Sequence, residues 1–361
     1  MKKIVLTLLL TACVSVSAYG TGASVTGLGI WAGKVHEYAN PFDPNFDRNA
    51  DSATITRAPG WDVGRSLAAI VNRMDGRDES KGSGRVQKAN GGGESTWITF
   101  QAAQPFTVGT IIVSQRVWYD FASAMPYTLK FGNGGAVADW DNIAAVPTSD
   151  SFTAAGTPDW KKFEIAHFSG TYNSFRIDAT AANYNNTGYF DINEVVILPD
   201  VLHRVVPTVS ASSTGLNANP AKLVSMGNYD LDGWWSADGV TGNVTATFTF
   251  DQPQRIDAIV FWSYENHDAC FTLQYTDLDS GLPVEVADIR MPKGDALGCV
   301  LPVQLDVPLY AKEFTLSFDL APGQTAALRE VMFFEKPIPE PATMSLLALG
   351  GLAMLRRRRG A

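Results

Sequence analysis

The sequence contains few of the residues that catalytic centres and metal sites need. It has only four histidines, and they lie far apart in the chain: His36, His167, His203 and His267. No His-Glu-x-x-His zinc helix, Gly-x-Ser-x-Gly turn or Walker loop occurs. We therefore predict no catalytic residues and interpret each histidine as a surface side chain. A carboxylate pair for glycoside hydrolysis stays open, because a sequence does not show the distance between two acids.

Long helical periods are also scarce. Ser66–Arg73 allows two helical turns at most, and Lys222–Met226 is shorter still. Short apolar runs between turn residues recur instead, which favours an all-β sandwich or barrel over an alternating βαβ sheet. The expected strands are Trp97–Phe100, Val108–Trp118, Tyr127–Phe131, Phe163–His167, Ser174–Ala179, Tyr189–Leu198, Val244–Phe250, Ile256–Ser263, Phe271–Tyr275, Val284–Ile289, Gln304–Val307, Phe314–Phe318 and Leu328–Glu335.

The composition suits folded domains of acidic character. The 361 residues are 45% hydrophobic and 11% aromatic, which excludes wholesale disorder and leaves room for two domains. The formal net charge is −9. Leaving out the terminal groups Lys2, Lys3, Glu340 and Arg356–Arg359 removes six of 28 basic and one of 37 acidic residues, so the remaining chain carries about −14. This charge argues against a nucleic-acid partner.

The N-terminus has the pattern of a secretory signal peptide. Two lysines precede an apolar run, Ile4–Leu10, and Val16-Ser17-Ala18 offers small residues for signal peptidase. We predict cleavage after Ala18. The alternative is a lipoprotein box, Leu10-Thr11-Ala12-Cys13, in which Cys13 would become the lipidated N-terminus.

The C-terminus combines three features in order. Pro339-Glu340-Pro341 precedes the apolar stretch Ala342–Leu355, which is closed by Arg356, Arg357, Arg358 and Arg359. Fourteen helical residues span only about 21 Å, which is short for a bilayer core of about 30 Å. The arginine cluster nevertheless predicts a short transmembrane helix with its end on the cytoplasmic side.

Residues Ile338–Arg359 resemble the PEP-CTERM sorting signal of Gram-negative bacteria, which is also catalogued as an ice-binding-protein C-terminal domain. The resemblance implies export, recognition of Pro339-Glu340-Pro341 by an exosortase, and placement at the cell envelope. An ordinary tail anchor is the alternative.

The two halves of the chain repeat one another. Trp97–Phe100, Gln104-Pro105 and Ile111–Val113 correspond to Ala246–Phe250, Gln252-Pro253 and Ala258–Val260. Each half then closes with a glutamate that enters an apolar strand, Glu194 in the first half and Glu330 in the second. Two copies of one β-sandwich explain this pattern, with a boundary at Pro199–Pro207.

The repeat resembles the discoidin, or factor 5/8 C-terminal, module, which has a galactose-binding-like jelly-roll fold. Asp232-Gly233 followed by Trp235 matches its loop, whereas Asp75-Gly76 lacks a tryptophan soon after it and Gln101-Ala102 replaces the usual Asp-Leu. We predict tandem jelly-roll β-sandwiches. The expected segments are a signal peptide at 1–18, an unassigned stretch at 19–59, sandwiches at 60–198 and 207–335 with a linker at 199–206, and the sorting segment at 338–361.

Calcium is the expected cofactor. The loop residues Asn228, Asp230 and Asp232 offer oxygen ligands at alternate positions before a glycine, but Gly239 stands where an EF-hand needs glutamate. The discoidin resemblance implies Asp232 and Glu330 as ligands, with Asp75, Asp78 and Glu194 as the counterparts in the first half. The alternative is a turn whose side chains cap their own backbone.

Aromatic residues after two strands are candidate sugar contacts, because a sugar's C–H face stacks on an aromatic ring. They are Tyr119, Phe121, Tyr264 and His267. Trp118 and Trp262 are in phase with their strands and are interpreted as core residues, and Trp235 as structural.

Two cysteines remain when Cys13 leaves with the signal peptide. Cys270 and Cys299 are expected to form a disulfide in an oxidising compartment, which would stabilise the second domain by about 3–4 kcal/mol.

These observations favour a non-enzymatic, exported surface protein that binds extracellular polysaccharide or mediates adhesion. A hydrolase or lyase acting on matrix polymers is one alternative, and a structural matrix protein whose ligand is another copy of itself is the other.

Overall fold

The structure, a computed structural model, describes residues 23–26, 35–38, 41–42, 55–65, 67–71, 84–88, 94–116, 127–134, 141–143, 161–182, 188–216, 218–225, 234–263, 269–291 and 300–337. In this part of the chain, strands dominate and the helices are two 3₁₀ segments, η1 (Leu67–Ile70) and η3 (Pro220–Val224). The predicted all-β class is therefore confirmed.

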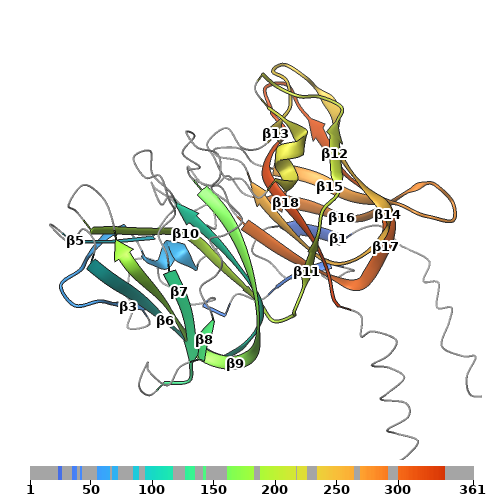
Figure 1. Cartoon of the computed structure of the whole chain (residues 1–361). Helices are drawn as coiled ribbons and strands as arrows, with labels where there is room; N and C mark the ends of the chain where they lie inside the picture. The colour runs from blue at the N-terminus through green and yellow to red at the C-terminus, as the bar shows by residue number, and fades with distance from the viewer. Residues whose placement is uncertain are drawn as a thin grey trace, which may run out of the picture.

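The first sheet has eight strands and is called unit 1. Its strands are β3 (Ile55–Arg57), β4 (Asp62–Arg65), β5 (Gly84–Lys88), β6 (Glu94–Arg116), β7 (Tyr127–Gly132), β8 (Asp141–Ile143), β9 (Lys161–Ala182) and β10 (Gly188–Leu198). They pair in the order β4-β5-β10-β6-β9-β7-β8, and β3 pairs with β6 (Figure 1).

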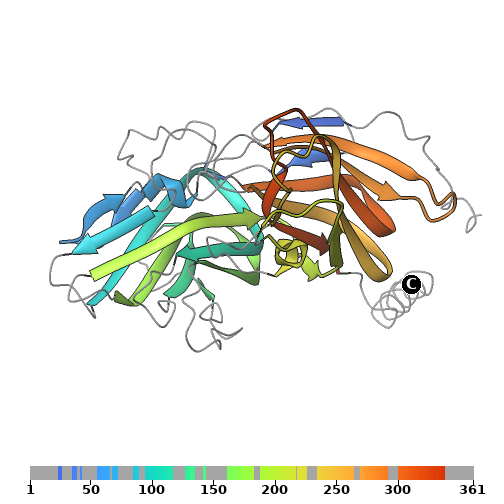
Figure 2. The same ribbon diagram turned by 90° about the horizontal axis from the view of Figure 1, so that it is seen from above.

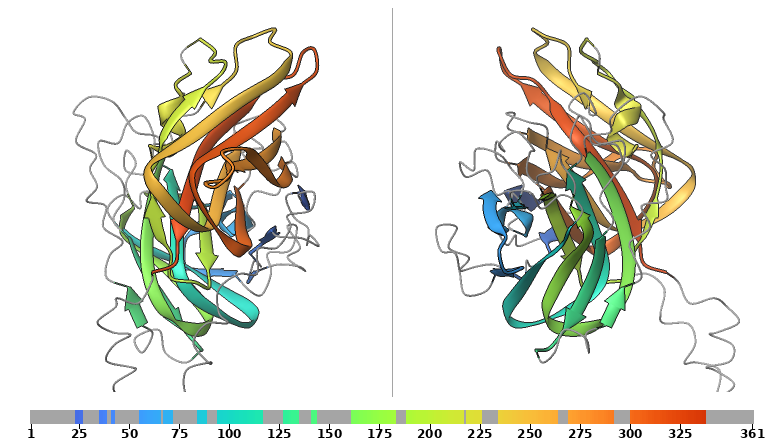
Figure 3. Two further views of the ribbon diagram at one scale, coloured as in Figure 1. Left: turned by 90° about the vertical axis from the view of Figure 1, so that its right-hand side faces the viewer. Right: turned by 60° about the vertical axis from the view of Figure 1, so that its left-hand side comes forward.

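The second sheet has ten strands. Eight of them form unit 2: β11 (His203–Val205), β12 (Thr208–Ala211), β13 (Trp234–Trp235), β14 (Gly242–Ser263), β15 (Ala269–Thr276), β16 (Pro283–Met291), β17 (Val300–Leu320) and β18 (Ala327–Glu335). The other two, β1 (Ala23–Thr26) and β2 (Val35–Glu37), come from the N-terminal segment and pair with β16 and β17. β11 lies inside the predicted linker and pairs with β18. β14 and β17 run through unit 2 as long curved strands (Figure 3).

The two units have the same strand order at their centres. β8-β7-β9-β6-β10 in unit 1 corresponds to β16-β15-β17-β14-β18 in unit 2. Val196 lies opposite Ile112, and its counterpart Met332 lies opposite Val260. Ile111–Val113 therefore corresponds to Ile259–Phe261, one residue later than the sequence comparison suggested. The difference matters because a shift of one residue in a strand exchanges its two faces.

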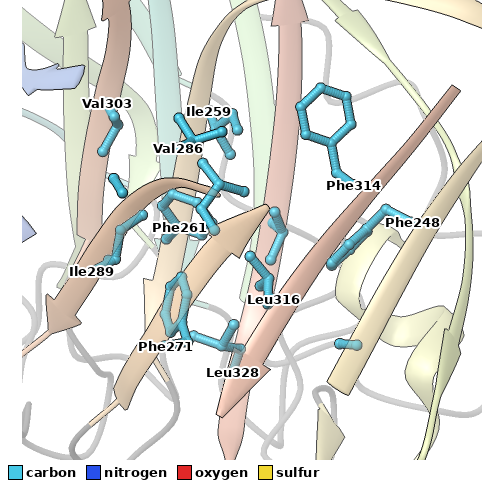
Figure 4. Close-up of a cluster of buried hydrophobic side chains, with 14 of the residues drawn as sticks. Phe248, Ile259, Phe261, Phe271, Val286, Ile289, Val303, Phe314, Leu316 and Leu328 are labelled. Atoms are coloured by element: carbon cyan, nitrogen blue, oxygen red, sulfur yellow. The ribbon is translucent and has the colours of Figure 1, made fainter. Parts of the chain in front are cut away.

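Each unit has an aromatic core on one face of its sheet. Unit 1 stacks Phe100 on Phe175, with ring centroids 4.6 Å apart. Unit 2 packs Phe333 against Phe248 and Phe314, with ring centroids 5.1 and 5.4 Å apart. Figure 4 shows Phe248 and Phe314 among the other side chains of this core. Between the bulges of the strands, every second side chain reaches the same face and enters the core.

A third apolar cluster joins the two units through the opposite faces of these strands. Ile112, Val196 and Leu198 of unit 1 belong to one buried cluster with Val260, Met332 and Phe334 of unit 2. The residues that the two units contribute are equivalent in the repeat, so the units contact each other through the same face of their sheets. The two units lie side by side in Figure 2. We call this cluster the inter-unit interface.

The sequence predicts Trp262 to be a core residue, and the structure places it at the interface between the units. It is buried, as expected, but it belongs to the inter-unit interface and not to the core of its own unit.

The backbone after β10 docks closely onto β6. A Cβ on Gly109 would lie 2.2 Å from the carbonyl carbon of Asp200, so this contact requires glycine. Next to it, Thr110 Oγ1 donates to the carbonyl of Asp200 at 2.7 Å and accepts from the Leu202 N–H at 2.8 Å.

Polar contacts reinforce the same junction. Lys336 follows β18, and its Nζ lies 3.0 Å from the Asp200 carboxylate. The Tyr38 hydroxyl donates a hydrogen bond to the same carboxylate at 3.1 Å. Burial, and then the charge of Asp200, raise the pKa of Tyr38.

The N-terminal segment contacts all three apolar clusters within eight residues. Val35 is buried in the unit 2 core, Tyr38 in the inter-unit interface, and Phe42 packs against Phe100 and Phe175 in unit 1. Part of the unassigned 19–59 stretch is thus a structural bridge between the units.

Candidate functional site

Many residues singled out in the sequence lie outside the described residues. They are Asp75, Asp78, Tyr119, Phe121, Asn228, Asp230, Asp232, Tyr264, His267, Cys299 and the sorting residues 339–341 and 356–359. The roles assigned to them stay predictions. Glu194, Glu330 and Cys270 are described.

Glu330 is a fully buried acid with a cationic partner. Its Oε1 lies 3.3 Å from Arg204 Nη2, which also donates to the Val224 carbonyl at 2.5 Å. Burial lowers the pKa of Arg204, and the charge of Glu330 opposes that effect. Arg204 therefore ties β11 and η3 to β18 and compensates the charge of Glu330.

Glu194 is the counterpart of Glu330 in unit 1 and is also fully buried. It opens the apolar end of β10 opposite Ser114 of β6, next to a register shift in the ladder. The two glutamates therefore occupy equivalent positions in the last strand of each unit. From there on, the strand is buried on both of its faces.

Cys270 lies on β15, and its side chain is exposed. It forms no disulfide with any residue in the described ranges. The predicted bond to Cys299 stays a prediction.

The structure brings together two histidines that the sequence separates. His167 of β9 and His203 of β11 stack their rings with centroids 5.1 Å apart and an interplanar angle of 12°. Partial desolvation, and then the neighbouring His203, lower the pKa of His167. His36 has different partners, Asp306 at 2.5 Å and Gln304 at 3.0 Å on β17. Both side chains are exposed, as expected, but they are not isolated from one another, and their contact depends on how the units dock.

The histidine pair predicts a loss of stability in acid. Unfolded His167 titrates near its ordinary pKa of 6.5, whereas the folded side chain takes up its proton only at lower pH. The folded state therefore loses stability as the pH falls from about 6.5 towards the lowered pKa, because the unfolded state binds more protons. Thermal unfolding over this range should show a weaker pH dependence in His167→Gln than in the native chain. Equal slopes would contradict the assignment.

A row of side chains on the face of the unit 1 sheet opposite Ile98 and Ile177 consists of Trp97, Lys130, Arg176 and Asp178, and we call it the charged row. Trp97 also packs against the unit 1 core. Arg176 lies over the Trp97 ring, with its guanidinium carbon 4.2 Å from the centroid, and its Nε donates to Asp178 Oδ1 at 2.7 Å. Lys130 Nζ lies 2.9 Å from Asp178 Oδ2. The sequence analysis did not single out this row, although alternation along β6, β7 and β9 places its members on one face.

The described residues contain no group of three or more His, Cys, Asp or Glu side chains that could hold a metal ion. None of the helices in the described ranges is long and apolar enough to cross a membrane. The predicted C-terminal transmembrane helix and the signal peptide lie outside these ranges.

Comparison with known proteins finds one family match. Residues 337–359 match the PEP-CTERM protein-sorting motif, which confirms the motif predicted at the C-terminus. No curated protein matches the chain.

Solved structures similar to the chain include carbohydrate-binding proteins. The two CBM32 domains of Clostridium perfringens ZmpB, in complex with GalNAc, share 10% identity over 79% of this chain and 90% of theirs, with a TM-score of 0.30. The family 32 module of C. perfringens NanJ, in complex with galactose, shares 15% identity over 36% of this chain and 93% of its own, also with a TM-score of 0.30. A fucolectin from striped bass (Morone saxatilis) serum shares 10% identity over 79% of this chain and 96% of its own, with a TM-score of 0.29.

Proposed function

We propose that the protein is exported, associates with the cell envelope through its C-terminal segment, and binds extracellular polysaccharide without catalysing a reaction. The sorting motif at residues 337–359 carries the proposal, because this motif implies export and processing by an exosortase. A cleaved signal peptide at 1–18 and a short C-terminal membrane segment complete the proposed route.

The binding role is supported by the repeated architecture. The shared strand order of the two units and the discoidin-like pattern around Asp232-Gly233 and Trp235 support two jelly-roll sandwiches, proposed at 60–198 and 207–335. Such a sandwich can present loops to a sugar, and Tyr119, Phe121, Tyr264 and His267 are the proposed contacts in those loops.

A glycan array with the purified full-length chain in detergent tests the binding role. We expect retention of at least one class of polysaccharide, with the intact polymer recovered after incubation. Shortening of the polymer would favour the hydrolase or lyase alternative. Self-association without any glycan retention would favour the structural matrix alternative.

Fractionation of the native host tests the route of export. The chain should be found in the envelope, and replacement of Pro339-Glu340-Pro341 by alanines should alter its processing. Recovery of the intact chain from the cytosol would contradict the proposal.

We also propose Ca²⁺ as a structural cofactor of the loop that holds Asn228, Asp230 and Asp232, with Asp75, Asp78 and Glu194 as the equivalent set in unit 1. A hard cation needs several oxygen ligands close together, which this loop chemistry offers. Glu330 is the proposed further ligand in unit 2, and Arg204 already compensates its charge through Oε1.

Calcium should therefore raise the unfolding temperature of the full chain. At about one hundred times the dissociation constant the expected stabilisation is about 2.7 kcal/mol, because the ion binds the folded state alone. Asp232→Asn should abolish the shift seen on adding Ca²⁺ after a chelator. An identical melting curve with Ca²⁺ and with chelator would contradict the proposal.

A further inference from the structure

Two cations and one anion meet in the charged row of unit 1, which gives this row a formal charge of about +1 on a chain of net charge −9. Strand pairing sets Arg176 opposite Lys130, and Asp178 opposite Trp97. The side chains of Arg176, Asp178 and Lys130 are 15%, 20% and 26% exposed, so they are ordered by their neighbours and still reach solvent.

Trp97 and Asp178 hold the guanidinium of Arg176 in one orientation. The indole ring supports its face at 4.2 Å, and the bond to Asp178 uses only one of the five N–H donors of arginine. Because the guanidinium is already ordered in the free protein, binding a ligand costs little further side-chain entropy. A fixed planar guanidinium favours recognition of a planar anion.

The position of Asp178 indicates which chemical group the two cations can bind. Its two carboxylate oxygens lie at 2.7 Å from Arg176 Nε and 2.9 Å from Lys130 Nζ, so the spacing of the cations accommodates a carboxylate. Thr99 on β6 and Thr128 on β7 share this face and offer hydroxyl groups beside it.

We propose that the charged row is a second binding site, specific for carboxylated polysaccharide, in which Arg176 and Lys130 hold the carboxylate of a uronate residue. Asp178 orients the two cations, and Trp97 supports Arg176. This inference rests on the proposed polysaccharide-binding function and names a ligand class and a sheet-face location for it, separate from the loop contacts.

Unit 2 provides a control within the same chain. Its equivalent positions carry Thr245, Gln274, Thr315 and Ser317, none of which is charged. Ser317 donates to Asn243 Oδ1 at 2.7 Å in place of the ion pairs of unit 1. The site is therefore proposed for unit 1 alone.

Titration of the full chain with polygalacturonate, with neutral dextran and dextran sulfate as further probes, tests the proposal. Lys130→Ala and Arg176→Ala should each weaken polygalacturonate binding by about tenfold, whereas Thr315→Ala should not change it. Asp178→Asn should strengthen binding, because the amide oxygen can still accept from Arg176 Nε and hold its orientation, while the competing negative charge is removed. Added salt should weaken the native affinity.

In a binding site, the Asp178 variant and the two cation variants change the affinity in opposite directions. In a purely structural ion-pair network, all three variants would lower the unfolding temperature and leave binding unchanged. That result would overturn the proposal, as would equal affinity for dextran sulfate. Binding of neutral glycans without polygalacturonate would refute this site and leave the proposed function standing. Retention of no polysaccharide of any kind would refute both.

Discussion

Met332→Asp is expected to separate the two units while each keeps its own core. Met332 is fully buried in the inter-unit interface, and its neighbours Val331 and Phe333 point into the unit 2 core instead. An unpaired carboxylate at this position loses the packing of the methionine and meets no water, a combined cost of about 3–5 kcal/mol. Small-angle scattering should show a larger radius of gyration for the variant.

Met332→Leu is the matched control for this prediction. It conserves volume and should cost less than about 1.5 kcal/mol, with unchanged scattering. Thermal unfolding of Met332→Asp should separate into two transitions, because the cores of units 1 and 2 no longer stabilise one another. A single transition and an unchanged radius would show that the interface does not hold the units together.

Glu330→Ala is expected to destabilise unit 2 by about 3–5 kcal/mol, because it leaves the guanidinium of Arg204 uncompensated in a buried environment. The Arg204 side chain is 17% exposed, so little water can replace the lost carboxylate. Denaturant unfolding, followed by a signal from unit 2, measures the change.

The double variant Arg204→Met with Glu330→Leu removes both charges and serves as the control. Replacing both partners by apolar groups should recover much of the stability lost in Glu330→Ala, because neither member of this pair then leaves the other uncompensated. If Glu330→Ala were as stable as the native chain, the ion pair would have no structural role.

Much of the strand pattern could be predicted because strands are encoded in short runs of sequence. The alternation around Phe100 and Phe248 identifies β6 and β14, and the echo between Glu194 and Glu330 identifies two copies of one strand order. The predicted break at residues 104–105 and 252–253 is absent, since β6 and β14 continue through Gln104-Pro105 and Gln252-Pro253 as bulged strands. A bulge interrupts the ladder locally and bends the strand without ending it.

One signal of the interface was present in the sequence and was not used. Val195–Leu198 and Val331–Phe334 are continuous apolar runs, and such a run predicts burial on both faces of a strand. The runs could have indicated that β10 and β18 are covered twice. They could not have shown that residues of both strands belong to one cluster between the units.

The amino-acid sequence alone established the sorting motif, the all-β class and the internal repeat, because each depends on patterns within short segments of the chain. The fold in three dimensions decided the rest: the docking of like faces, the stacking of His167 on His203, the pairing of Arg204 with Glu330 and the bridge from Val35 to Phe42. Each of these joins residues from separate strands or units. Their contact depends on how the sheets pack, and local propensity contains no information about that packing.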